Sequence, residues 1–294
     1  MAMWMTCVYL WSDPADELTD PSGTGPGSIA PKLRVYGVSG VSRLTGPVAP
    51  LRAEPMSSGT MEPPVGPLVA SDPATAPSHT PLHGRYTSLV PLQPSHAEAI
   101  FKHLGREENA WRWTYLFNEP FLEYEQCEAA FKQWSVSKDP LYFTVLSGPA
   151  SNPSSEPVGV MAYLSIVPGH RRIEIGCIIF SEQLKQTRAA TEAQYLLMKN
   201  AFDGLGNYRL EWKANHLNKP SLAAAERLGY TYEGTFRKHM VIKGRRRDTA
   251  WFSITDDEWP VIKGGLEAWL SEDNFDENGR QRKGLKQCRE SFKA

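Results

Sequence analysis

The sequence contains few cysteines, and their spacing does not suggest a shared site. Cys7, Cys127, Cys177 and Cys288 are scattered through 294 residues, and none belongs to a Cys-x-x-Cys pair. This spacing indicates neither a zinc site nor a disulfide framework. We therefore expect a protein of the reducing cytoplasm that uses no metal.

The chain also lacks an excess of charge and a long apolar run. Its formal net charge is -1, from 32 basic and 33 acidic residues, which argues against a general binder of nucleic acid or of membrane surfaces. No apolar run approaches the roughly 20 residues that span a bilayer. The apolar start, residues 1–11, has no basic segment and is followed by acidic residues, so we interpret it as neither signal nor transit peptide.

Residues 1–83 lack any periodic apolar segment. They contain 13 of the 23 prolines, and such a composition cannot bury enough apolar surface to offset its ordering entropy. We therefore expect a disordered Pro/Gly/Ser-rich leader at 1–83, a folded domain at 84–260, and a C-terminal helix with a charged, frayed tail at 261–294. A tethering or targeting role for the leader stays open.

The chain is organised around residues 173–202. The apolar run 173–180, IEIGCIIF, is typical of a buried strand, and the apolar spacing from Ala190 to Phe202 is helical. A polar loop at 181–188 joins the two. A strand that leads through a tight loop into a helix N-terminus can hold an anion, because the first helical N–H groups are free.

Similar patterns place the other elements. We expect an α/β (α+β) fold with a mixed central sheet of about seven strands flanked by helices. The other strands are expected at 85–90, 141–146, 158–166, 208–214, 232–242 and 249–254, and the other helices at 94–104, 123–136, 218–229 and 256–270.

Two motifs in this pattern resemble the GNAT N-acetyltransferases. The loop 185–190, KQTRAA, matches their pyrophosphate loop, with Arg188 where the family has glycine. Asn218 and Ser221, an alanine-rich helix and then Leu-Gly-Tyr at 228–230 match a second family motif. The resemblance covers residues 85–259, and Thr-Glu-Ala at 191–193 is similar to the RimJ/RimL-type ribosomal-protein enzymes and the microcin self-immunity enzymes.

The resemblance implies a sheet splayed at an acyl-CoA site. Acetyl-CoA would be a co-substrate bound by the end of the central strand, by the loop and by the second motif, and Ser221 would protonate the leaving thiolate. The implied acetyl-CoA contacts are Ile178, Ile179, Phe180, Lys185, Gln186, Thr187, Arg188, Ala189, Ala190, Asn218 and Ser221.

The general base is left open. The related enzymes have a glutamate where this chain has Met240. His239 adjoins it, but neighbours on a strand face opposite ways, and Glu174 on the central strand could act through water. A water chain without any side-chain base is a further alternative.

Two surface features have alternative interpretations. The aromatic segment 111–121 resembles a segment that is associated with acceptor recognition in the self-immunity enzymes, so it could form a substrate wall, or it could pack helices onto the sheet. The basic turn 243–247 could meet a CoA phosphate or an acidic partner, or be solvated. The proposed wall residues are Trp111, Trp113, Tyr115 and Phe121.

The sequence therefore predicts an N-acetyltransferase. It would move an acetyl group from acetyl-CoA to a primary amine by direct attack in a ternary complex, without metal. The acceptor would be a small molecule, an aminoacyl compound or a protein N-terminus, and a homodimer is left open. The alternatives are a non-catalytic acyl-CoA-binding or sensing module, and a structural protein that binds no CoA.

Overall fold

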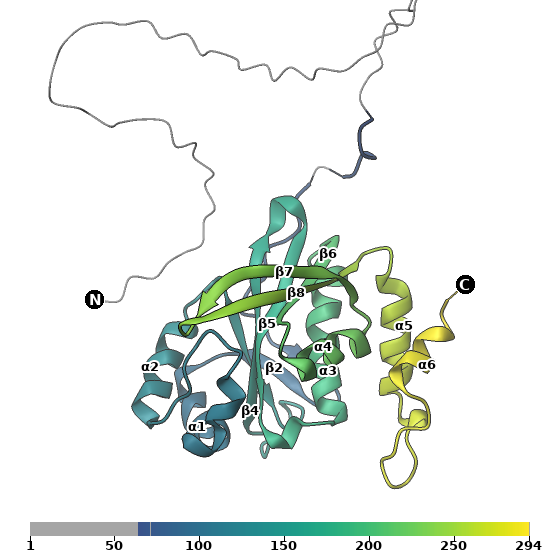
Figure 1. Cartoon of the computed structure of the whole chain (residues 1–294). Coiled ribbons are helices and arrows are strands. Elements are labelled where there is room, and N and C mark those ends of the chain that lie inside the picture. Colours follow the sequence, from purple (N-terminus) through teal and green to yellow (C-terminus); the bar gives the residue numbers. More distant parts are fainter. Residues whose placement is uncertain (1–63, 71, 294) are drawn as a thin grey trace, which may run out of the picture. The chain divides into compact units, whose positions relative to one another are not determined.

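The computed structural model describes residues 64–70 and 72–293, and one eight-stranded sheet runs through its folded part between Leu82 and Thr255 (Figure 1). Its strand order is β1-β2-β3-β4-β5-β6-β8-β7. The strands are β1 Leu82–His83, β2 Ser88–Pro91, β3 Leu141–Leu146, β4 Pro157–Val167, β5 Arg172–Phe180, β6 Arg209–Asn215, β7 Thr231–Ile242 and β8 Arg245–Thr255. The α-helices of this part are α1 Ala97–Leu104, α2 Tyr124–Trp134, α3 Arg188–Lys199, α4 Lys219–Leu228, α5 Trp259–Leu270 and α6 Leu285–Glu290.

The sheet is mixed and opens in its middle. All neighbouring strands are antiparallel except β5 and β6, which pair in parallel only where Arg172–Glu174 meet Arg209–Glu211. Beyond that point β5 continues to Phe180 and β6 to Asn215 without pairing to each other. The expected splayed sheet is thus confirmed, with β1 as an additional strand too short for a sequence pattern to reveal.

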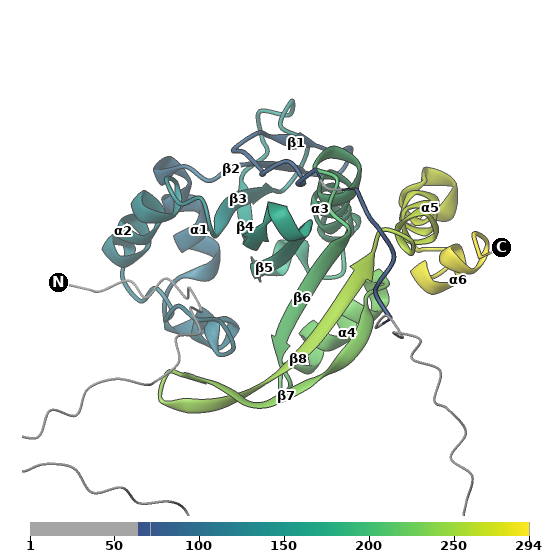
Figure 2. The same cartoon turned by 90° about the horizontal axis from the view of Figure 1, so that it is seen from above.

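Helices cover both faces of the sheet (Figure 2). On β3, Leu141 and Phe143 join the larger core cluster with α3, α4 and α5, whereas Tyr142 between them joins the smaller cluster with α1 and α2. Successive strand side chains point to opposite faces, so one strand serves both clusters. The two helix groups therefore lie on opposite faces of the sheet.

The boundary expected at residues 83/84 falls inside packed structure. The backbone N–H of Ala74 donates to the Pro168 carbonyl at 3.0 Å, and the N–H of Thr75 donates to Leu205 at 2.8 Å. Ala74 is 6% exposed, and Leu82 pairs with Leu89 in the sheet. This segment is bound to the domain by backbone hydrogen bonds, and no apolar pattern in the sequence predicts that contact. Residues 1–63 and 71 of the leader expected at 1–83 lie outside the described residues.

Removing the docked segment should destabilise the domain. We expect a protein that begins at residue 84 to melt several degrees below one that begins at residue 72, since about 1 kcal/mol shifts the melting temperature by that amount. Thermal unfolding of the two truncations, measured by circular dichroism, tests this. Equal melting temperatures would show that residues 72–83 contribute nothing to stability.

The C-terminal segment is packed rather than frayed. Leu285 and Cys288 on α6 are 3% and 4% exposed and belong to the larger core cluster. Phe275 forms a β-bridge with Gln281 before that helix. The sequence of residues 272–294 is dominated by charged side chains. The two apolar residues of α6, Leu285 and Cys288, are therefore not conspicuous in it. The boundary expected at 260/261 also falls inside α5, which starts at Trp259.

Candidate active site

A β-bulge on β5 forms one edge of the opening. Val160 on β4 pairs with Ile179, whereas Ala162 pairs with Gly176, so the register shifts by one residue between these pairs. Cys177, in the bulge, has a left-handed φ of 51°. A bulge leaves a residue unpaired and redirects the strand. Ile178 and Ile179, the expected backbone donors to the thioester, lie directly after it.

The N-terminus of α3 lies beside the end of β5. The Thr187 hydroxyl caps the helix by accepting the Ala190 N–H at 3.1 Å. Gln186, one residue earlier, has a left-handed φ of 58°. No hydrogen bond in residues 64–70 and 72–293 engages the backbone N–H of Arg188 or Ala189. Free N–H groups at a capped helix start are suited to phosphate.

The Arg188 side chain turns away from this loop. Its guanidinium lies 4.6 Å from the ring centre of Tyr86 and 4.4 Å from that of Phe275. Both rings lie outside the loop, one before β2 and one after α5. Arg188 therefore joins the C-terminal segment to the domain, and a contact from it to phosphate stays a prediction. Lys185, also in the loop, pairs with Glu182 at 3.0 Å.

The N-terminus of α4 brings Asn218 and Ser221 together. The Asn218 side-chain oxygen accepts the Ser221 N–H at 3.4 Å, which confirms the expected cap and leaves the amide NH₂ free to donate. The Ser221 hydroxyl oxygen accepts the indole N–H of Trp212 at 3.1 Å. Because that bond uses a lone pair, the hydroxyl proton remains available for a partner.

Glu174 lies on the opposite face, at the closed end of the opening. It is 5% exposed, and its carboxylate pairs with Lys213 at 2.8 Å and accepts the Ser165 hydroxyl at 3.0 Å. Burial raises the pKa of Glu174 despite these two partners. Its charge also reaches Cys177, so the carboxyl group lies beside the bulge. A carboxylate with a raised pKa is suited to accept a proton near neutrality.

His239 lies on the same face, further along the β7–β8 hairpin. The register shifts between the Phe236–Thr249 and Met240–Arg247 pairs, so simple alternation does not apply to His239. Its Nδ1 is 3.0 Å from the Thr249 hydroxyl. Burial, followed by the nearby Arg247 and Lys213 charges, lowers the pKa of His239, which keeps the imidazole neutral at pH 7.

The structure corrects the substrate-wall hypothesis for two rings. Trp113 and Phe121 are 2% and 6% exposed and pack in the smaller core cluster. Trp111 is 62% exposed, and Tyr115 is half-buried. The wall interpretation overlooked Phe117, whose exposed ring lies 5.1 Å from the Arg247 guanidinium. Packing decides which rings of such a segment face outward, and the sequence shows no period there.

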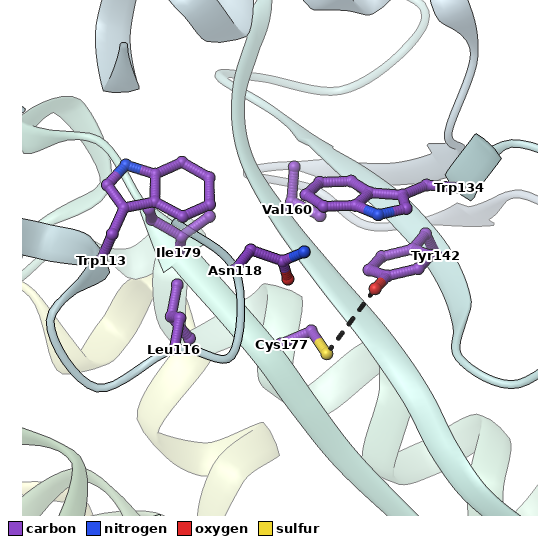
Figure 3. Close-up of a pocket in the computed structure, with 8 residues that line it drawn as sticks. All are labelled: Trp113, Leu116, Asn118, Trp134, Tyr142, Val160, Cys177 and Ile179. Carbon is purple, nitrogen blue, oxygen red and sulfur yellow. Dashed lines mark hydrogen bonds between the residues drawn. The ribbon is translucent and has the colours of Figure 1, made fainter. Parts of the chain in front are cut away.

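A small cavity joins the aromatic segment to the bulge (Figure 3). Its volume of about 10 Å³ is close to the minimum for one water molecule. The Tyr142 hydroxyl points to the Cys177 sulfur at 4.0 Å. Burial raises the pKa of the Cys177 thiol to about 12, so the thiol stays protonated and is no nucleophile. The lining residues are Trp113, Leu116, Asn118, Trp134, Tyr142, Val160, Cys177 and Ile179.

The described residues offer neither a metal site nor a membrane-spanning helix. Within residues 64–70 and 72–293, His, Cys, Asp and Glu form no cluster of three or more that could hold a metal ion. The helices of the same part of the chain are too short or too polar to cross a membrane.

The comparisons with known proteins agree with this geometry. The family model described as "Acetyltransferase (GNAT) domain" matches residues 87–231. A GCN5-related N-acetyltransferase from Brucella melitensis is 41% identical with a TM-score of 0.71, over 74% of this chain and 98% of that one. A probable GNAT-family acetyltransferase from Chromobacterium violaceum ATCC 12472 is 35% identical with a TM-score of 0.61, over 68% and 100%. The chain therefore belongs to the GNAT acetyltransferase family, which confirms the resemblance.

A more distant structure shares the fold alone. The microcin C7 self-immunity acetyltransferase MccE, in complex with acetyl-CoA and AMP, is 18% identical with a TM-score of 0.51. The alignment covers 58% of this chain and 93% of that one. The search of curated proteins found no match.

Proposed function

We propose that the chain moves an acetyl group from acetyl-CoA to a primary amine by direct attack in a ternary complex. One observation carries the proposal: the opening between β5 and β6 has the free N-terminus of α3 on one side and the Ser221 hydroxyl on the other. MccE, which has this fold, was crystallised with acetyl-CoA. Among the described residues, the cysteines are free thiols, namely Cys127, Cys177 and Cys288. Free thiols are typical of proteins that act in the reducing cytoplasm.

Different residues of the opening bind different parts of acetyl-CoA. The free N–H groups at the start of α3 receive the pyrophosphate, and the Asn218 amide holds the pantetheine arm. The backbone N–H groups that follow the bulge, at Ile178 and Ile179, donate to the thioester oxygen. Donors placed where negative charge develops favour the transition state over the ground state.

Proton transfers complete the reaction. The amine nitrogen forms a bond to the thioester carbon, and the carbon–sulfur bond breaks. Glu174 accepts the amine proton through a water, and Ser221 gives its proton to the leaving thiolate. Ser221 then regains a proton from water, and Glu174 returns its proton to water, which restores both groups. Lys213 and Ser165 hold the Glu174 carboxylate in place. The acceptor enters from the face that carries Glu174, opposite to α3 and α4.

A non-catalytic acyl-CoA sensor is the second candidate. It is favoured by Arg188, which stands where the family motif has glycine and stacks on Tyr86 and Phe275. A sensor would bind acetyl-CoA at the same opening but release no thiol with any amine. Turnover therefore separates the two functions, and binding does not.

An added negative charge just before the α3 N-terminus tests the binding site. We expect Gln186→Asp to weaken acetyl-CoA binding by tenfold or more, roughly 1.4 kcal/mol, because the carboxylate would lie beside the pyrophosphate. Aspartate tolerates the left-handed backbone of this residue. Calorimetry on the wild type and the variant gives the two affinities. Gln183→Asp is the matched control, because Gln183 is exposed and lies outside residues 185–190. An unchanged dissociation constant for Gln186→Asp would remove the loop from the site.

A further inference from the structure

Arg247 is a buried cation that has no carboxylate partner among the described residues. Its side chain is 6% exposed. Its Nε donates to the Thr249 hydroxyl at 3.1 Å, and its guanidinium lies over the Phe117 ring at 5.1 Å. Within the described residues, Arg247 forms no ion pair with any aspartate or glutamate. A buried charge without a counter-charge is costly, so the site is built for an anion from outside.

The surrounding acids already have other partners. Burial lowers the pKa of Arg247, and the charge of Glu174 partly opposes this effect. Glu174 itself is bound elsewhere, as are the other acids near the hairpin. The pairs are Glu174 and Glu211 with Lys213 at 2.8 and 3.0 Å, Asp248 with Arg246 at 2.8 Å, and Glu119 with Lys243 at 3.4 Å.

A second unpaired donor lies on the same strand. The indole N–H of Trp251 is buried and has no partner among the described residues. Arg247, Thr249 and Trp251 alternate along β8, so their side chains lie on one face of the sheet. This face also carries Lys213, whose ammonium lies 4.2 Å from the Trp251 ring centre. The Lys213 charge is already paired with Glu174 and Glu211, so the guanidinium of Arg247 and the indole N–H of Trp251 are the donors on this face that suit an anionic ligand.

Arg247 lies on the hairpin that reaches the acceptor side of the opening. The tip of the β7–β8 hairpin reaches the segment between α1 and α2 (Figure 2), where the Lys243 ammonium donates to the Trp113 carbonyl at 3.0 Å. Trp113 and the neighbouring Asn118 line the small cavity beside the bulge. Arg247 therefore lies on the face from which the acceptor would enter, beyond Glu174.

We propose that the acceptor amine carries an anionic group, a carboxylate or a phosphate, and that Arg247 binds this group. This inference rests on the proposed acetyl transfer and narrows its acceptor class. The planar guanidinium donates two parallel N–H bonds to such a group. Phe117 supports the other side of the guanidinium, and the amine end of the acceptor extends toward Glu174. Arg247 is thus a specificity-determining residue rather than a catalytic one.

Matched acceptor pairs test the inference. The first pair is aminoethyl phosphate against ethanolamine, the second is alanine against alaninamide, and the third is a peptide beginning with Asp against one beginning with Asn. We expect the anionic member of at least one pair to have a kcat/KM at least tenfold higher, as measured by thiol release from acetyl-CoA, because a charge-assisted bond in a buried site is worth about that factor. The three pairs distinguish phosphate, free carboxylate and peptide sources.

Three variants assign the preference to a residue. Arg247→Gln should abolish it, and Arg247→Lys should keep part of it, because the charge remains without the bidentate geometry. Arg246→Gln is the matched control, because that arginine is adjacent, 59% exposed and paired with Asp248, and it should keep the full preference. A wild-type protein that uses both members of every pair equally would overturn the inference. A preference that survives in a folded Arg247→Gln protein would overturn it as well.

A binding measurement separates this inference from the proposed reaction. If no amine releases thiol, acetyl transfer is wrong, but the anion site can still be tested by NMR. Inorganic phosphate, titrated into the acetyl-CoA complex, should shift the indole N–H signal of Trp251 in the wild type and in Arg246→Gln, but not in Arg247→Gln. A Trp251 signal that does not move in the wild type, or that moves equally in Arg247→Gln, would contradict an anion site at Arg247.

Discussion

Replacing Ser221 by alanine should lower kcat by about 10²-fold, the low end for general acid catalysis, and leave the acetyl-CoA dissociation constant nearly unchanged. In the proposed mechanism the hydroxyl acts on the leaving thiolate, so its contribution would arise in the transition state rather than in binding. The Ser221 oxygen accepts the Trp212 indole N–H, and this contact holds the hydroxyl oxygen in place while its proton stays available to donate. Steady-state thiol release and calorimetry on the same purified protein measure both quantities.

A structural role for Ser221 predicts a different result. Loss of the Trp212 hydrogen bond alone would cost about 1 kcal/mol of unfolding free energy, with kcat nearly intact. Ser221→Cys is the matched variant, because a thiol can still donate a proton and should restore part of the rate. A normal kcat in Ser221→Ala at saturating acetyl-CoA and acceptor would end the assignment of Ser221 as the acid.

Replacing Glu174 by glutamine should lower kcat by 10²-fold or more, the scale of general base catalysis. Glutamine keeps the size and the hydrogen bond from Ser165 but cannot accept a proton. Since burial raises the pKa of Glu174, the wild-type rate should fall as the pH drops through that raised value, where the carboxylate becomes protonated. The pH profile of kcat, measured for both proteins, should lose this limb in Glu174→Gln.

His239→Gln is the comparison that decides between the two bases. Histidine ordinarily has a pKa of about 6.5. If His239 were the base, its lowered pKa would put the acid limb of the pH profile below that value. We expect His239→Gln to keep kcat within tenfold, because Glu174 is the proposed base and the His239 Nδ1 already lies 3.0 Å from the Thr249 hydroxyl. A large loss in His239→Gln with a normal rate in Glu174→Gln would transfer the base role to His239.

Much of the fold follows from local sequence patterns. The run 141–146 alternates between two cores and was predicted with the bounds that β3 has. Asn218 and Gly229 were expected to begin and end a helix, and the structure shows the Asn218 cap and a left-handed Gly229 with φ 108°. These signals are strong because each depends on residues close together in the chain.

The parts that were missed depend on distant contacts. The docking of Ala74 and Thr75 uses backbone atoms of segments far along the chain, and the β7 bulge near His239 is set by pairing with β8. The basic turn 243–247 was considered only as a whole. Alternation along the strand could have separated the exposed Arg246 from the buried Arg247, because neighbours face opposite ways.

The most direct test of the central claim is thiol release from acetyl-CoA by the purified protein with a panel of primary amines, combined with mass spectrometry of the products. The account predicts release that requires both the protein and an amine, an acetylated amine as the product, and a strongly reduced rate in Ser221→Ala. Tight binding of acetyl-CoA without thiol release from any amine would contradict catalysis and favour the sensor, and an absence of acetyl-CoA binding would contradict both.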